Sequence, residues 1–201
     1  MKRLHQSRRE EILDHALDVI QEVGLGNLTM QKIADQVGFT QPALFKHFAS
    51  KEELVLGLMD RLEELLLLPI EEIAADKSRP PIERIEAILR HHMDLIEERN
   101  SLPILLLAEA SASESKPLLK KMREIHGRYL LTLERLSRRL PAVNDGRRRP
   151  KHDCVAMLLM GIPSAFAIRN RLRPKPDTKD RILKNLIPFV LETLCEDWSE
   201  R

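Results

Sequence analysis

Residues 29–54 read TMQKIADQVGFTQPALFKHFASKEEL, and this stretch decides the fold. Ile33, Ala34 and Val37 have the spacing of the apolar face of a short helix. Ala34 is small, so a second helix can cross close to it. Gly38 stands where the first helix should end, because glycine adopts the left-handed backbone of a helix C-terminus at little cost.

The second half of the stretch predicts two further helices. Thr40 can cap a helix that has Pro42 in its first turn, with Leu44 and Phe48 facing the core. The positions left on the outer face are Gln41, Ala43, Lys46 and His47. Ser50 and Glu53 form a capping box for a longer third helix. This pattern is a helix-turn-helix, whose second helix enters the major groove of DNA.

The same stretch resembles the tetracycline-repressor (TetR) family of bacterial transcription regulators. The resemblance rests on the register of Gly24, Leu28-Thr29, Ile33-Ala34, Val37-Gly38-Phe39, Leu44-Phe45, His47-Phe48 and Ser50-Lys51-Glu52-Glu53-Leu54. One position departs from the family pattern. Phe45 stands where the family usually has a tyrosine whose hydroxyl commonly contacts a phosphate, so we expect Phe45 to pack instead.

The resemblance implies a domain organisation and a function. Residues 1–50 would form the DNA-binding domain, and residues 51–201 a helical domain for effector binding and dimerisation. In the family, the last two long helices pair with their copies in a second chain, which implies a homodimer through about residues 151–198. The implied function is a cytoplasmic transcriptional regulator, expected to be a repressor, which a small-molecule effector releases from a palindromic operator in double-stranded DNA.

The composition of the whole chain agrees with an all-α fold. The 201 residues are 43% hydrophobic but only 3% aromatic, so Leu and Ile supply the apolar mass, which favours packed helices. Two cysteines, Cys154 and Cys195, form no paired motif and indicate a reduced, cytosolic protein. The apolar runs are too short to span a bilayer, and the first residues lack the apolar segment of a signal peptide.

Apolar periodicity and helix-capping residues predict about nine helices. Residues 1–6 are expected to be a mobile basic arm, and Ser7 to cap the first helix. Pro69 is expected to bend or end the fourth helix. The predicted helices span about residues 8–23, 30–37, 41–47, 51–69, 82–98, 104–111, 117–140, 151–171 and 178–198.

The predicted DNA contacts lie on and beside the second helix of the motif. Gln41 and Lys46 are expected to read base edges, since Gln pairs with adenine and Lys with guanine, and Ala43 to touch a thymine methyl group. The other predicted contacts are Thr29, Thr40, Pro42, His47 and Lys51, mainly with phosphates. The plainer alternative is that these are solvated helix residues and that both threonines only cap helices.

The predicted effector pocket lies among the central helices, as the resemblance implies. Its candidate residues are His92, Met93, Ile96, Leu106, Glu109, Met122, His126, Tyr129, Met157, Met160 and Phe166. The alternative for each is an ordinary core residue. Glu109 is the most pointed candidate, because a carboxylate in the apolar run PILLLAEA needs a partner: a cationic ligand, His92 or His126, an arginine, or water.

Two other classes of function are alternatives with less support from the sequence. A small all-α enzyme could use Glu109 and His126 as an acid–base pair, and a regulator could work without ligand control. We expect no metal site and no cofactor, because adjacent His91 and His92 point about 100° apart on a helix and no Cys/His cluster has ligand spacing.

Overall fold

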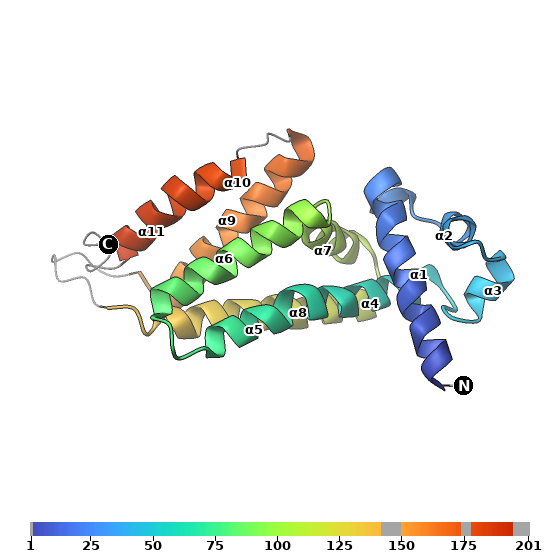
Figure 1. The fold of residues 1–201 in the computed structure, drawn as a ribbon, viewed down its shortest axis with the longest axis horizontal. Helices are drawn as coiled ribbons and strands as arrows, with labels where there is room; N and C mark the ends of the chain where they lie inside the picture. The colour runs from blue at the N-terminus through green and yellow to red at the C-terminus, as the bar shows by residue number, and fades with distance from the viewer. Residues whose placement is uncertain (1, 142–149, 174–177, 195–201) are drawn as a thin grey trace. The chain divides into compact units, whose positions relative to one another are not determined.

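The computed structural model describes residues 2–141, 150–173 and 178–194, and these are helical apart from the connections between helices. Within these ranges the elements join into nine continuous helices (Figure 1), which confirms the predicted all-α fold. The elements are α1 (Lys2–Val23), the 3-10 turn η1 (Leu25–Asn27), α2 (Met30–Val37), α3 (Gln41–Phe45), α4 (Lys51–Leu62), η2 (Glu63–Leu67), α5 (Leu68–Ala75), α6 (Pro81–Glu98), α7 (Leu102–Ala112), α8 (Lys116–Ser137), α9 (His152–Leu172), α10 (Thr178–Arg181), η3 (Ile182–Leu186) and α11 (Ile187–Leu194). The predicted helix end at Trp198 and the second cysteine, Cys195, lie outside the described residues.

The chain divides into two compact units. Unit 1 comprises Met1–Glu63 and Leu102–Glu124, and unit 2 comprises Glu64–Ser101 and Ile125–Arg201. Unit 1 therefore contains α1 to α4, α7 and the first part of α8. The division of function between residues 1–50 and residues 51–201 stays a prediction.

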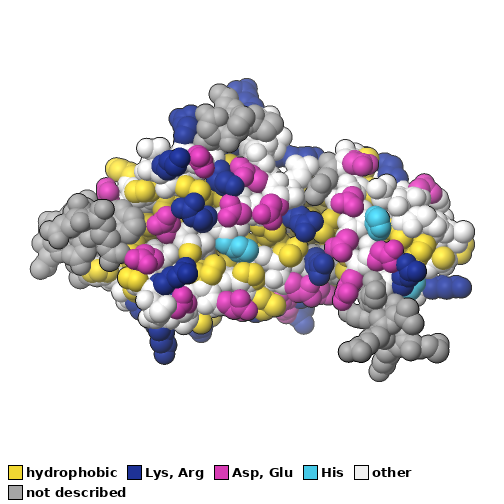
Figure 2. All heavy atoms as spheres, viewed as in Figure 1, with side chains coloured by type: hydrophobic (Ala, Val, Ile, Leu, Met, Phe, Trp, Pro, Cys, Tyr) yellow, Lys and Arg dark blue, Asp and Glu magenta, His cyan; other side chains and the backbone are white. Residues whose placement is uncertain are grey.

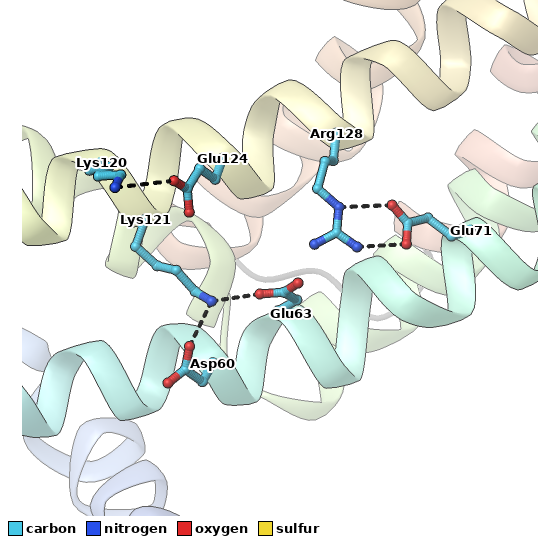
Figure 3. A network of polar contacts seen from close by, with 7 residues as sticks. All are labelled: Asp60, Glu63, Glu71, Lys120, Lys121, Glu124 and Arg128. Carbon is cyan, nitrogen blue, oxygen red and sulfur yellow. Dashed lines mark hydrogen bonds and ion pairs between the residues drawn. The ribbon is translucent and has the colours of Figure 1, made fainter.

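The core of unit 1 forms where α1 packs against α2 and α4. Ile12, Ala16 and Leu17 of α1 are buried together with Ile33 and Ala34 of α2. Gly57 allows α4 to approach α1 closely, since a Cβ atom there would lie 3.0 Å from Cδ2 of Leu13. On α8, Lys121 forms ion pairs of 2.6 Å with both Asp60 and Glu63, as Figure 3 shows.

The start of α1 differs from the prediction. The helix begins at Lys2, so the expected mobile arm and the expected cap at Ser7 are wrong, and Ser7 lies inside the helix. The physical reason is the composition of KRLHQSRRE, which has no Gly or Pro and is rich in Lys, Arg, Leu, Gln and Glu, all of which favour a helix.

The core of unit 2 forms where α6 packs against α9 and α5. The helix that contains α4 and α5 does not end at Pro69 but continues to Ala75. A π-helical turn, η2, ends two residues before the proline, where it can accommodate the ring and the missing N–H. Pro188 has the same arrangement, because the π-helical turn η3 precedes it.

The link between α6 and α7 has an unusual backbone. Asn100 and Ser101 both have positive φ angles, 45° and 62°, which residues other than glycine rarely adopt. Ser101 is fully buried, and its hydroxyl donates a hydrogen bond of 3.2 Å to the carbonyl of Ala167 in α9. This hydrogen bond holds Ser101, the last residue before α7, against α9 within unit 2.

The described surface is mixed in charge and polarity. Figure 2 shows basic and acidic side chains interspersed with hydrophobic ones over the face in view. No helix within the described ranges is both long and apolar enough to cross a bilayer.

Candidate nucleic-acid interface

The first helix of the motif, α2, is capped at both ends as predicted. Thr29 has an extended backbone, and its hydroxyl accepts a hydrogen bond of 3.2 Å from the Lys32 N–H. Gly38 adopts the left-handed conformation with φ of 73°, and the next N–H, of Phe39, donates to the Ala34 carbonyl at 2.8 Å. The glycine therefore makes the tight turn into α3.

The second helix, α3, begins at its predicted cap. The Thr40 hydroxyl accepts a hydrogen bond of 3.3 Å from the Ala43 N–H, and Pro42 lies in the first turn. Leu44 and Phe48 are fully buried and anchor this segment to the core of unit 1. The helix ends at Phe45, earlier than predicted, so His47 lies in the turn that follows.

The predicted base-reading and phosphate-contacting residues lie at the surface. Thr29, Thr40, Pro42 and Lys46 are exposed, whereas Gln41, Ala43, His47 and Lys51 are half-buried. The Lys46 ammonium has no partner among the described residues. One face of α3 is therefore open to a ligand while the opposite face is buried.

Phe45 does not pack in the core. Its side chain is 43% exposed, and its expected packing role in place of a phosphate contact stays a prediction. The reason for its exposure is its position on α3, because Leu44 and Phe48 already occupy the inward face of this segment.

The capping box at the start of α4 is present and is tied to α1. The Ser50 hydroxyl accepts a hydrogen bond of 3.1 Å from the Glu53 N–H, and the Glu53 carboxylate accepts one of 2.7 Å from the Ala49 N–H. The Ala49 N–H, with a smaller contribution from Arg9, holds the pKa of Glu53 below its usual value. A carboxylate in this position also favours the helix N-terminus.

Arg9 is the residue that sequence reasoning missed. Its guanidinium donates to Glu53 at 3.1 Å and to the backbone carbonyl of His47. It also lies over the Phe48 ring, 4.1 Å from the ring centroid. Arg9 thus joins α1 to the segment that follows α3. No local pattern marks this role, because the partners are distant in sequence.

Glu109 finds its partner in unit 1. Its carboxylate lies 3.6 Å from the Lys51 ammonium, so the predicted phosphate contact and the predicted effector residue meet in one ion pair. The pair joins α4 to α7, which pack against each other. The carboxylate therefore has a partner, as expected, but a lysine is not among the partners that the sequence suggested.

The other predicted effector residues have different environments. Leu106 and Met122 are buried in unit 1. In unit 2, Met160 is half-buried, and the buried residues are His92, Met93, Ile96, Tyr129 and Phe166. His126 is exposed and Met157 is 64% exposed, and the effector role of all these residues stays a prediction. The proposed acid–base pair has no support, since Glu109 pairs with Lys51.

A buried polar pair lies in the core of unit 2. Nδ1 of His92 lies 3.2 Å from the Tyr129 hydroxyl, and both side chains are buried. Burial, with a smaller contribution from neighbouring His91, lowers the pKa of His92 to about 3. Burial also raises the pKa of Tyr129. Both groups are therefore neutral at physiological pH.

Two cavities of unit 2 lie away from the predicted pocket. The larger, of about 620 Å³, is lined by Arg169, Thr178, Arg181, Ile182, Asn185, Leu186 and Phe189. The second, of about 370 Å³, is lined by Glu71, Ala74, Ala75, Lys77, Thr132, Arg135, Leu136 and Arg139. None of the predicted effector residues lines either of them. Within the described residues, no three His, Cys, Asp or Glu side chains gather to hold a metal ion.

The capped α2–turn–α3 unit, with one buried and one open face on α3, defines a helix-turn-helix DNA-binding protein. Residues 12–58 match the family model described as bacterial regulatory proteins, tetR family. The chain belongs to this family and is a DNA-binding transcriptional regulator. Its family is one of regulators and not of enzymes.

Known proteins resemble the chain in sequence or in fold. The nucleoid occlusion factor SlmA of Vibrio atlanticus (strain LGP32) is 30% identical over 133 residues, which cover 66% of this chain and 67% of that protein. A transcriptional regulator from Rhodococcus sp. Rha1 has the same fold, with a TM-score of 0.75, 20% identity, and 92% and 96% of the two chains covered. The structure of AibR with isovaleryl coenzyme A and operator DNA matches with a TM-score of 0.68, 24% identity, and 90% and 97% coverage.

Proposed function

We propose that this regulator is a repressor that binds a palindromic operator as a homodimer and is released by a small-molecule effector. The observation that carries the proposal is the open face of α3. Lys46 is exposed there and Gln41 and Ala43 are half-buried, beside a helix whose start Thr40 fixes. Residues of these types contact base edges and phosphates in the major groove.

The surface of the last helices supports a homodimer. Exposed apolar side chains gather on α9 and on the α10–α11 helix: Met157, Leu158, Ile168, Leu172, Leu186 and Phe189. Leu172 is 75% exposed and Phe189 is 65% exposed. Apolar side chains in such numbers on two adjacent segments indicate an interface, and a two-fold copy of the same helices would cover them. A two-fold protein reads a palindrome.

Effector control has two kinds of support. AibR, which has the same fold, is described in complex with both isovaleryl coenzyme A and operator DNA. In this chain, the Lys51–Glu109 pair connects a predicted phosphate contact to α7. A ligand would change the affinity for DNA only if its own affinity differed between the protein with this ion pair formed and the protein with the pair broken.

A second candidate is a DNA-binding factor without effector control. Two observations favour it: the relatives named nucleoid occlusion factor SlmA, and the burial of His92, Met93 and Ile96 away from both described cavities. A thermal-shift screen separates the candidates. A ligand that binds the folded state raises the melting temperature, and under the first proposal it also weakens operator binding. If no ligand in the screen raises the melting temperature and the protein still binds DNA, the second candidate is favoured.

DNA binding itself is tested by mobility shift and fluorescence anisotropy on the promoter region of the gene, over a range of salt. We expect Gln41→Ala to relax sequence preference. Lys46→Ala should lower the slope of log K against log salt by about 0.9 for each phosphate that the variant no longer neutralises. Lys120→Ala, which removes the same charge from an exposed site on α8, is the control. Equal effects of Lys46→Ala and Lys120→Ala, or no binding at low salt, would contradict the proposal.

Dimerisation is tested by sedimentation equilibrium. Met157→Glu and Phe189→Glu should each convert the dimer to a monomer, because each places a charge on the apolar surface of α9 or α11. Leu131→Glu, at a 42% exposed apolar residue on α8, should leave the dimer intact. A wild-type monomer at micromolar concentration would overturn this part of the proposal.

A further inference from the structure

The second cavity of unit 2 has a distinct construction. It lies between α5 and the C-terminal part of α8, and its volume is about 370 Å³. Its lining includes the buried residues Thr132 and Leu136 and the small side chains of Ala74 and Ala75. Its volume falls within the range of small-molecule sites. None of its lining residues belongs to the apolar surface proposed for dimerisation.

The charges around this cavity are unbalanced. Glu71 is its one acidic lining residue, and Arg128 neutralises it through two hydrogen bonds of 3.0 and 2.7 Å, drawn in Figure 3. The three basic lining residues, Lys77, Arg135 and Arg139, have no partner among the described residues. The lining therefore carries three uncompensated positive charges.

Neighbouring arginines outside the cavity behave differently. Arg138 pairs with Glu134 at 2.5 Å, and Arg79 pairs with Asp76 at 3.3 Å. Two arginines near the cavity in sequence are thus neutralised, while the three cations that line it are not. Arg138 and Arg79 also provide matched controls for an experiment.

We infer that this cavity binds a phosphorylated small molecule. Both α5 and α8 end beside it, and each helix C-terminus contributes about half a negative charge. The three positive charges outweigh the roughly one negative charge of the two helix C-termini, which leaves a net charge of about +2. This net charge suits a phosphate dianion better than a single carboxylate. Arginine binds phosphate through two parallel hydrogen bonds. The Thr132 hydroxyl donates to the Arg128 carbonyl at 2.9 Å, so its oxygen can still accept a hydrogen bond from a sugar or phosphate hydroxyl.

A small molecule fits the geometry better than a nucleic acid. The three cations line one cavity whose lining also includes buried side chains, whereas a duplex backbone needs cations spread along an open surface. Binding at this cavity is measured directly and does not depend on the proposed repressor function.

Isothermal titration calorimetry of the full chain, with ADP, inorganic pyrophosphate and adenosine as probes at constant ionic strength, tests the inference. We expect ADP and pyrophosphate to bind and adenosine to bind at least tenfold more weakly. The double change Arg135→Gln with Arg139→Gln should reduce ADP affinity at least tenfold. Arg138→Gln should leave it within twofold of the wild type. A matched melting temperature and circular dichroism spectrum show that each variant is folded.

A further variant separates specific recognition from simple charge. Arg135→Lys keeps the positive charge near the end of α8 but loses the two-pronged hydrogen bonding, so it should weaken ADP binding severalfold. The inference is overturned if neither ADP nor pyrophosphate binds, or if Arg138→Gln weakens binding as much as the double variant. It is also overturned if the double variant lowers DNA affinity as much as Lys46→Ala does, since the surface would then serve nucleic acid.

Discussion

Nε2 of His91 lies 2.9 Å from the backbone carbonyl oxygen of Leu65. This carbonyl is four residues before Pro69, which has no N–H to donate to it. The imidazole from α6 therefore supplies a hydrogen-bonding partner where the proline removes the intrahelical one. The contact also fastens α6 to the π-helical turn that precedes α5.

The first prediction is that His91→Ala and Pro69→Ala are coupled. His91→Ala should lower the free energy of unfolding by about 1 kcal/mol, the usual net value of one hydrogen bond. In the Pro69→Ala background the helix can supply its own donor, so the same change should cost less. Urea denaturation of the two single variants and the double variant gives the coupling energy. Strict additivity would show that the proline and the histidine act independently.

The second prediction concerns His92 and pH. Its pKa is lowered to about 3 in the folded protein, so below its ordinary value of about 6.5 the unfolded chain binds more protons. Stability is therefore fully present above about pH 6.5 and falls as the pH drops. From pH 7 to pH 5 this group should remove about 2 kcal/mol.

Two variants isolate the contribution of His92 from that of the other histidines. His92→Gln, which keeps an amide near the Tyr129 hydroxyl but does not titrate, should flatten the pH dependence measured by denaturation. Tyr129→Phe leaves the imidazole buried and should retain the dependence. Parallel pH profiles for His92→Gln and the wild type would rule out the buried imidazole as the cause.

The third prediction concerns the Lys51–Glu109 pair. Glu109→Gln removes the carboxylate 3.6 Å from the Lys51 ammonium, which should free the lysine and tighten DNA binding. Lys51→Ala should weaken DNA binding, and adding Glu109→Gln to it should change nothing more. Stability should change little in all three variants, because a partly exposed ion pair contributes about 0–1 kcal/mol. Fluorescence anisotropy measures the affinities. Tighter binding by Glu109→Gln in the Lys51→Ala background would point to a general charge effect.

The fourth prediction restores a hydroxyl at Phe45. The side chain is 43% exposed on α3, so Phe45→Tyr should fold normally and present its hydroxyl to solvent. A hydrogen bond to phosphate worth about 1 kcal/mol would tighten operator binding about fivefold. The same change should not alter sequence preference, since phosphate contacts carry none. Unchanged affinity would place the ring away from the backbone of DNA.

The fifth prediction compares two glycines in helices. A Cβ atom at Gly127 in α8 or at Gly161 in α9 would meet nothing within 4 Å in the single chain. Gly127→Ala and Gly161→Ala should each raise the free energy of unfolding by about 0.5–1 kcal/mol, because alanine favours a helix interior more than glycine does. Gly161 lies on α9, where we propose that a second copy packs, so Gly161→Ala should also weaken dimerisation while Gly127→Ala should not. Sedimentation equilibrium distinguishes them, and equal dimer affinities would argue against close packing at Gly161.

Sequence reasoning succeeded where one short segment determines its own structure. Thr29, Gly38, Thr40 and the Ser50–Glu53 box act on backbone groups within a few residues, so spacing alone identifies them. The exposure of Lys46 and the burial of Leu44 follow from the same helical period.

Sequence reasoning failed where the partner is remote or where a signal has two outcomes. Arg9 contacts His47 and Glu53 far along the chain, and no pattern in the sequence marks those contacts. Pro69 predicts a bend or an end of its helix, but a π-helical turn accommodates it and His91 approaches the affected carbonyl. The cationic cavity was missed for the same reason, because Lys77 lies in the turn after α5 and Arg135 lies near the end of α8.

The contacts of Arg9 make the position of the segment after α3 depend on a residue outside the motif. Its side chain reaches a carbonyl 38 positions away, in the turn that leaves α3, and lies over Phe48, which anchors the segment that follows α3. The reading helix is therefore not a self-sufficient module that could be transplanted with its own two helices alone. A graft of α2 and α3 onto another scaffold would have to bring along the start of α1, or supply an equivalent cation, to hold the helix at the angle the groove requires.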